Sequence, residues 1–183
     1  MLFRPTNVPV MEKKQPLATK PAHNDNSAMN QSPPIETLPV SPDNLAFGQV
    51  RLRFVRVVPG DESRHFVPSY HFRIINAEGS DVGHINFRVG DTEHVLVCAG
   101  HIGFEVLKEF RGRGYALEAC RALAPFVRSL YQAVTITANP DNHASIRTIE
   151  RLGAIFFDEV TVPPHDPGFQ RGSPRKKRFK WTP

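Results

Sequence analysis

Arginine and glycine alternate in the segment Arg111-Gly112-Arg113-Gly114, and Tyr115 and Ala116 follow it directly. Glycine lets backbone N–H groups approach an anion closely, and arginine adds charge and further hydrogen-bond donors. The segment comes a few residues after a strand-like pattern and opens a helix-like one. Because the N-terminus of a helix carries free N–H groups and the positive end of its dipole, a pyrophosphate is the expected ligand here.

The same segment also has simpler explanations. The glycines could form only a tight turn between a strand and a helix, and the arginines could form only a solvated edge. A nucleotide site of the Rossmann or Walker type does not fit, because neither G-x-G-x-x-G nor G-K-[ST] is present. On its own, a Gly-Arg-Gly segment does not decide between a turn and a phosphate site.

The elements that must position this segment can be read from the pattern of apolar residues. Residues 50–57 alternate apolar and basic side chains, which predicts a half-buried strand. Further strands are expected at 70–76, 82–89 and 100–107, with turns between them. This half of the chain therefore predicts an antiparallel meander.

A helix is expected directly after the Gly-Arg-Gly segment, because apolar residues recur there at spacings of three and four. They are Ala116, Ala119, Cys120, Leu123, Phe126, Val127 and Leu130. A strand at 134–137, a second helix at 143–152 that Gly153 ends, and strands at 155–162 and 177–181 follow. The order β-β-β-β-α-β-α-β-β predicts an α/β (α+β) fold with a mixed, mostly antiparallel sheet flanked by helices.

Composition divides the 183 residues into a tail and one domain. Residues 1–45 contain repeated prolines among polar residues and no strand or helix period, so they are expected to be disordered. Residues 46–183 are expected to form the domain. Two cysteines, Cys98 and Cys120, cannot form a disulfide framework, and buried free thiols and a cytoplasmic location are expected.

The net charge of +5 and the pI of about 9.5 are compatible with a phosphate-rich partner. Much of the charge lies in the basic run 175–178 near the C-terminus, which is expected to be solvated. Nucleic acid is not an expected partner, because no aromatic-basic motif occurs beyond Phe179 and Trp181. No apolar stretch of about 18 residues exists, so no membrane span is expected, and neither is a metal site.

Two motifs resemble those of the GNAT acetyltransferases. Arg111-x-x-Gly114-x-Ala116 matches the R/Q-x-x-G-x-G/A signature of that family, and residues 103–119 resemble the subgroup that acetylates ribosomal-protein N-termini. Residues 142–154 are similar to the N-x-x-S…E-K-x-G-F segment of the same family. The two motifs occur in the family's order and spacing, which neither of them establishes alone.

The resemblance implies acetyl-CoA as cofactor. In this family the strand before the loop separates from its neighbour and offers backbone groups to pantetheine, a place that Val106 and Leu107 would take. Residues Gly112, Arg113, Gly114, Tyr115 and Ala116, together with Arg111, would hold the pyrophosphate. Asn142 would contact pantetheine.

The resemblance also implies catalytic residues, with one departure from the family. Where many relatives have a tyrosine that protonates the departing thiolate, this chain has Ile149, so Ser145 is the expected substitute. A local backbone hydrogen bond of the Ser145 hydroxyl is the competing explanation. Glu105 is the expected general base, with His84, His101, His165 and water as alternatives. Strand alternation would place His101, Gly103 and Glu105 on one face.

The second departure concerns the acceptor side. GNAT proteins usually have two helices between the first two strands, but residues 59–69 leave room for only a short turn, so these helices are expected to be shortened or absent. The sequence thus predicts an acetyl-CoA-dependent N-acetyltransferase acting on a protein N-terminus, a lysine or a small-molecule amine. A non-catalytic CoA-binding or nucleic-acid-associated module is the alternative, and a homodimer through strand edges stays open.

Overall fold

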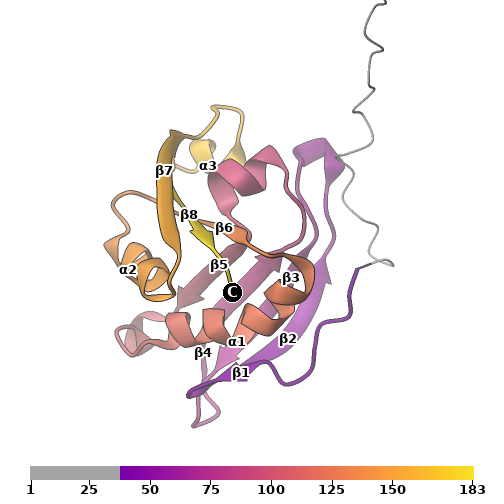
Figure 1. Cartoon of the computed structure of the whole chain (residues 1–183), viewed down its shortest axis with the longest axis vertical. Coiled ribbons are helices and arrows are strands. Elements are labelled where there is room, and N and C mark those ends of the chain that lie inside the picture. Colours follow the sequence, from indigo (N-terminus) through magenta and orange to yellow (C-terminus); the bar gives the residue numbers. More distant parts are fainter. Residues whose placement is uncertain (1–37) are drawn as a thin grey trace, which may run out of the picture.

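The computed structural model describes residues 38–183, which form two antiparallel sheets (Figure 1). The first sheet has the order β1 (Ala46–Phe47), β2 (Val50–Val58), β3 (Ser69–Ile75), β4 (Asp81–Arg88) and β5 (Ile102–Val106). The second has the order β6 (Val134–Ala138), β8 (Arg175–Trp181) and β7 (Ile155–Thr161). The predicted α/β (α+β) fold with mostly antiparallel strands is confirmed.

The two longest described helices, α1 (Tyr115–Leu130) and α2 (His143–Arg151), lie where the sequence predicts them. Four short helices were not predicted: η3 (Glu62–Arg64), the π-helix η4 (His94–Ala99), η5 (Lys108–Phe110) and α3 (Pro167–Gln170). The sequence predicts a turn at residues 90–93 and no element at residues 94–99, which form η4. None of the described helices is both long and apolar enough to cross a membrane.

Helix α1 packs on one face of the five-stranded sheet, and aromatic residues fill the contact. The ring of Phe126 lies edge-on to Tyr70 at 4.9 Å and to Phe87 at 5.5 Å between centroids. Such edge-to-face pairs add specificity to the burial of apolar area. This packing fixes the N-terminus of α1 beside the end of β5, where the glycine-rich loop connects the two elements.

The face of the sheet opposite α1 has much less cover. Between β2 and β3 the chain forms only the single turn η3 and an isolated bridge between Asp61 and Phe66. The expected shortening of the two helices after the first long strand is therefore confirmed.

The predicted disorder of residues 1–45 falls mainly on residues 1–37, which lie outside the described part of the chain. Leu45, just before the predicted domain boundary at residue 46, is buried in the core. The two cysteines are free and buried, as expected.

Candidate active site

Strands β5 and β6 are neighbours that separate along their length. At the start of β5 the His101 N–H donates to the Thr135 carbonyl at 2.8 Å, and the Thr135 N–H donates to Nδ1 of His101 at 3.1 Å. Beyond this point, no backbone hydrogen bond joins β5 to β6 in residues 38–183, and the two strands belong to different sheets. A cleft therefore opens between their C-terminal ends.

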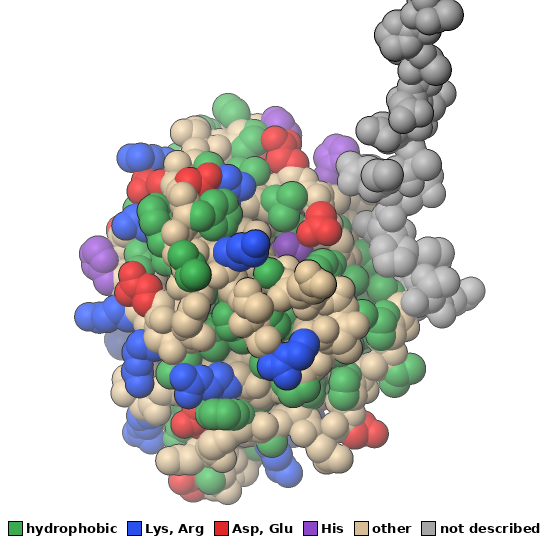
Figure 2. Space-filling model, viewed as in Figure 1, with side chains coloured by type: hydrophobic (Ala, Val, Ile, Leu, Met, Phe, Trp, Pro, Cys, Tyr) green, Lys and Arg blue, Asp and Glu red, His purple; other side chains and the backbone are tan. Residues whose placement is uncertain are grey.

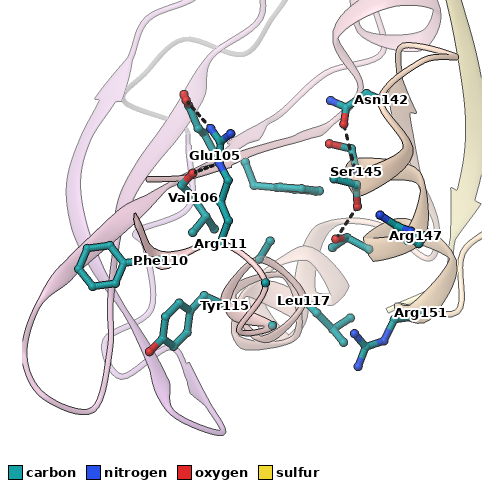
Figure 3. Close-up of a pocket in the computed structure, with 16 residues that line it drawn as sticks. Glu105, Val106, Phe110, Arg111, Tyr115, Leu117, Asn142, Ser145, Arg147 and Arg151 are labelled. Atoms are coloured by element: carbon teal, nitrogen blue, oxygen red, sulfur yellow. Dashed lines mark hydrogen bonds and ion pairs between the residues drawn. The ribbon is translucent and has the colours of Figure 1, made fainter. Parts of the chain in front are cut away.

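A pocket of about 570 Å³ occupies the open end of this cleft (Figure 3). The end of β5, the glycine-rich loop, the first turn of α1 and one side of α2 enclose it. Its lining residues are Phe104, Glu105, Val106, Phe110, Arg111, Gly112, Gly114, Tyr115, Ala116, Leu117, Asn142, Ala144, Ser145, Arg147, Thr148 and Arg151.

The loop that leads into α1 presents a run of free backbone donors. Gly112 and Gly114 have φ angles of 81° and 86°, in the left-handed region that favours glycine. A Cβ at either position would meet no atom within 4 Å, so backbone conformation and not space requires glycine here. No N–H from Gly112 to Leu117 donates to another group in the described chain, whereas Glu118 N–H donates to Gly114 O. These donors can receive an anion.

Three arginines add positive charge around these donors. The Nε of Arg111 donates to the Val106 carbonyl at 2.9 Å, and its Nη2 lies 3.8 Å from a carboxylate oxygen of Glu105. Arg147 and Arg151 extend from α2 on the other side of the pocket (Figure 3). Four residues apart on a helix, the latter two share one face. The pocket therefore favours a ligand with several negative charges.

Helix α2 brings two polar residues to the rim of the pocket. Asn142 caps the helix, because its Oδ1 accepts the Ser145 N–H at 3.1 Å. None of the hydrogen bonds within the described residues uses the Ser145 hydroxyl, although this side chain is half-buried and lines the pocket. Ile149, one turn further on, is fully buried in the core and offers no proton.

A family model of a GNAT acetyltransferase domain matches residues 25–155, well over half of the chain. The chain belongs to the GNAT acetyltransferase family. The first sequence motif maps to the end of β5 and the loop that opens α1, and the second maps to α2, so that both line the same pocket of this GNAT domain. No match was found among curated proteins.

Solved structures with a similar fold are acetyltransferases. The microcin C7 self-immunity acetyltransferase, in complex with acetyl-CoA and AMP, is 18% identical over 63% of this chain and 61% of its own, with a TM-score of 0.50. The ribosomal-protein-S5-alanine acetyltransferase from Vibrio fischeri is 16% identical over 62% and 61%, with a TM-score of 0.48. A GNAT acetyltransferase from Bacillus anthracis is 24% identical over 61% and 65%, also with a TM-score of 0.48. The chain thus spans less than two thirds of these proteins, and likeness at this identity concerns the fold alone.

All but two of the predicted site residues of this GNAT domain line the pocket. Leu107 does not, and both of its backbone groups are used: its N–H donates to Val82 O and its carbonyl accepts from Phe110 N–H. Arg113 does not either, and its guanidinium lies 5.7 Å from the centre of the Phe110 ring. The sequence reasoning missed Arg147 and Arg151, although their spacing of four residues in an expected helix was a usable signal.

The candidate bases differ in their exposure and in their contacts. Glu105 is 60% exposed at the mouth of the pocket, and His84 lies directly across from it on β4. His101 is 2% exposed, its Nε2 contacts Asp91 at 3.0 Å, and burial lowers its pKa. Its ring packs against Tyr131 at the end of α1, so the expected alternation with Glu105 is wrong at His101. His165 is 74% exposed and pairs with Glu93 instead.

A second polar cluster lies under η4, outside the pocket. Ligand atoms of His94, Cys98 and Asp166 lie within 4.8 Å of one another. Asp166 already accepts from Gly168 N–H at 2.6 Å while its other oxygen contacts His94 Nδ1 at 2.7 Å. Burial raises the pKa of the Cys98 thiol to about 11, and the hydrogen bond and negative charge of Asp166 contribute to the rise. Lys176 adds a cation nearby. Asp166 thus caps α3 and is paired with His94.

Proposed function

We propose that this protein is an N-acetyltransferase that moves the acetyl group of acetyl-CoA to a primary amine. The observation that carries the proposal is the pocket itself, which is lined by the glycine-rich loop with its free N–H groups and by Arg111, Arg147 and Arg151. Membership of the GNAT family supports acetyl transfer in general. A cytoplasmic location is part of the proposal, supported by the free buried cysteines.

The residues present fit CoA. Its pyrophosphate needs several N–H donors at close range, which the glycine-rich loop offers, and its further phosphate needs cations, which α2 offers. Val106 and Asn142 lie along the path from this loop into the cleft, where the less polar arm would run. The similar fold of the microcin C7 self-immunity acetyltransferase was solved with acetyl-CoA.

When bound, acetyl-CoA supplies a thioester carbonyl that an amine can attack. The chain must then accept a proton from the amine and supply one on the thiol side. Glu105 and Ser145 stand on opposite sides of the pocket (Figure 3). We assign proton acceptance to the carboxylate of Glu105, directly or through water, and proton donation to the free hydroxyl of Ser145.

The proposal is tested by mixing the full chain with acetyl-CoA and a panel of peptide N-termini, lysine peptides and small amines. Release of the free thiol and addition of one acetyl group are measured.

Ser145→Ala should lower kcat about tenfold to a hundredfold with little change in acetyl-CoA affinity, since the backbone N–H that caps α2 stays.

Ser129→Ala is the matched control, because its hydroxyl on α1 bonds only the Phe126 carbonyl. An unchanged kcat in Ser145→Ala would return Ser145 to a structural role. Binding of acetyl-CoA with no transfer to any amine would favour a CoA-binding module instead.

A further inference from the structure

The sheet face opposite α1 carries a row of basic and polar side chains. Register places Arg56 on β2 beside His71 on β3, and His71 beside Asn86 on β4. Asn86 in turn lies opposite Gly103 on β5. Since directly opposed residues share a face, these positions form one line across four strands. This face is the one that the single turn η3 leaves largely uncovered.

The side chain of Arg88, at the end of β4, reaches this line beside Gly103 of β5, because glycine has no side chain to fill the space. A Cβ at Gly103 would lie 2.7 Å from Asn86 Oδ1 and 3.3 Å from Arg88 Nη1. The Nη1 group donates to the carbonyls of Ala99 and Gly100 at 3.3 and 3.1 Å. No hydrogen bond within residues 38–183 uses the other two nitrogens of this guanidinium.

The charge of this row is not neutralised within the described chain. Neither Arg56 nor Arg88 forms an ion pair with any carboxylate in residues 38–183. Burial lowers the pKa of Arg88, and Arg171 of the β7–β8 loop lowers it further. A half-buried guanidinium without a counter-charge is costly, and an anion that arrives from outside reduces that cost.

The Asp81 carboxylate near this face already has partners. Asp81 accepts two hydrogen bonds from Arg73, at 2.6 and 2.8 Å, and lies 3.8 Å from Arg53. Burial lowers the pKa of His71, and the charges of Arg56, Arg88 and His84 lower it further. The positive charge of the row therefore comes from Arg56 and Arg88, and the neutral ring of His71 between them can offer a hydrogen bond.

The row meets the pocket at Glu105. This residue lies opposite His84 on the uncovered face and also lines the pocket. A molecule whose amine enters the pocket beside Glu105 would continue across Gly103 toward β2. Three strand spacings, about 14 Å, separate β5 from β2, which equals about four residues of extended peptide. A small amine would reach only the first part of the row.

We propose that Arg56, His71 and Arg88 bind the acidic side chains of an acceptor peptide whose N-terminal amine enters the pocket beside Glu105. This inference rests on the proposed function and names its substrate class: peptide N-termini with Asp or Glu in the first few residues. The amine lies at the Glu105 end, and the carboxylates lie over the cations.

The test compares three peptides that differ only at positions two to four: an Asp/Glu version, its Asn/Gln counterpart and a Lys version. The full chain should acetylate the acidic peptide with a kcat/KM at least about tenfold above that of the amide peptide. The preference should shrink as salt is raised, because it is electrostatic. Arg56→Glu should remove most of the preference. Arg53→Gln is the control, since Arg53 is on the same strand but already near Asp81.

Binding of the same labelled peptides to the CoA-saturated chain, followed by fluorescence anisotropy, keeps this test separate from the proposed function. Equal binding of acidic and amide peptides, or an Arg56→Glu variant with the wild-type preference, would overturn the inference while transfer itself could stand. Free aspartate or glutamate accepted as well as the acidic peptide would also overturn it. Selective binding of the acidic peptide without acetylation would support the binding row and count against the proposed function.

Discussion

The arginines and glycines of the glycine-rich segment 111–114 have different roles. Residue type alone gives Arg111 and Arg113 the same charge, and the family signature singles out Arg111; only Arg111 reaches the pocket, while Arg113 lies over the ring of Phe110. The positions of the glycines were predictable from their type, because both have positive φ angles. The charge pattern alone could not show which arginine turns inward, since this depends on the Val106 carbonyl, whose position the fold sets.

The two arginines of α2 provide a prediction at this scale. Arg147→Ala with Arg151→Ala should raise the Kd of CoA at least about tenfold, because each removes a charged donor from the pocket. Arg113→Ala should change it less than about threefold. Calorimetric titration with CoA measures both. A loss of affinity in Arg113→Ala as large as in the α2 double variant would show that the side chain turns inward on binding.

Among the elements, the cleft between β5 and β6 depends on one buried histidine. His101 fastens the start of β5 to Thr135 of β6 through its backbone N–H and its ring. The Thr135 N–H donates to Nδ1, so Nε2 carries the proton and donates to Asp91 at 3.0 Å. The sequence indicated both strands by their apolar patterns. It could not indicate where they separate, because this depends on a contact between residues 34 positions apart.

This histidine should make folding stability depend on pH. Burial lowers the folded-state pKa of His101 below its ordinary value of about 6.5, so the unfolded chain binds more protons. The stabilisation is therefore present above about pH 6.5 and is lost as pH falls toward the folded-state pKa, by at most about 1.4 kcal/mol per pH unit for one proton.

Urea unfolding between about pH 7.5 and pH 5.5 measures this dependence. In His101→Asn the free energy of unfolding should change less with pH than in the wild type. The pH dependence that remains should come from His71, because burial also lowers the pKa of this residue. Equal slopes in the variant and the wild type would mean that His101 does not titrate as its burial requires.

The π-helix η4 is an element that the pattern of apolar residues could not predict. Its residues His94–Ala99 follow a segment that looks like a simple turn, and six residues are too few to establish a helical period. The element is held by contacts from elsewhere, such as the Thr137 hydroxyl to Cys98 O at 2.6 Å and Arg178 Nη1 to Leu96 O at 3.3 Å. Such tertiary contacts have no local signature.

Across the whole molecule, the two faces of the five-stranded sheet differ in character. One face packs on α1, while the other lies open because residues 59–68 are too few for a pair of helices. Figure 2 shows that, on the face it views, Lys and Arg side chains are spread over the surface among hydrophobic and acidic ones. The sequence could predict the missing helices by counting residues. It could not predict the cationic row, because a register shift between Phe54 and Arg56 decides which arginine of β2 joins it.

Calorimetric titration of the full chain with acetyl-CoA, beside Gly114→Val and Gly79→Val, tests whether the glycine-rich loop holds the cofactor. Both glycines have positive φ angles, 86° and 83°, and a Cβ at either would meet no atom within 4 Å, so the two substitutions strain the backbone alike. We expect saturable binding by the wild type and by Gly79→Val, and binding weakened at least about tenfold in Gly114→Val. Absence of binding by the wild type, or equal affinity in all three, would contradict the assignment of this loop as the cofactor site.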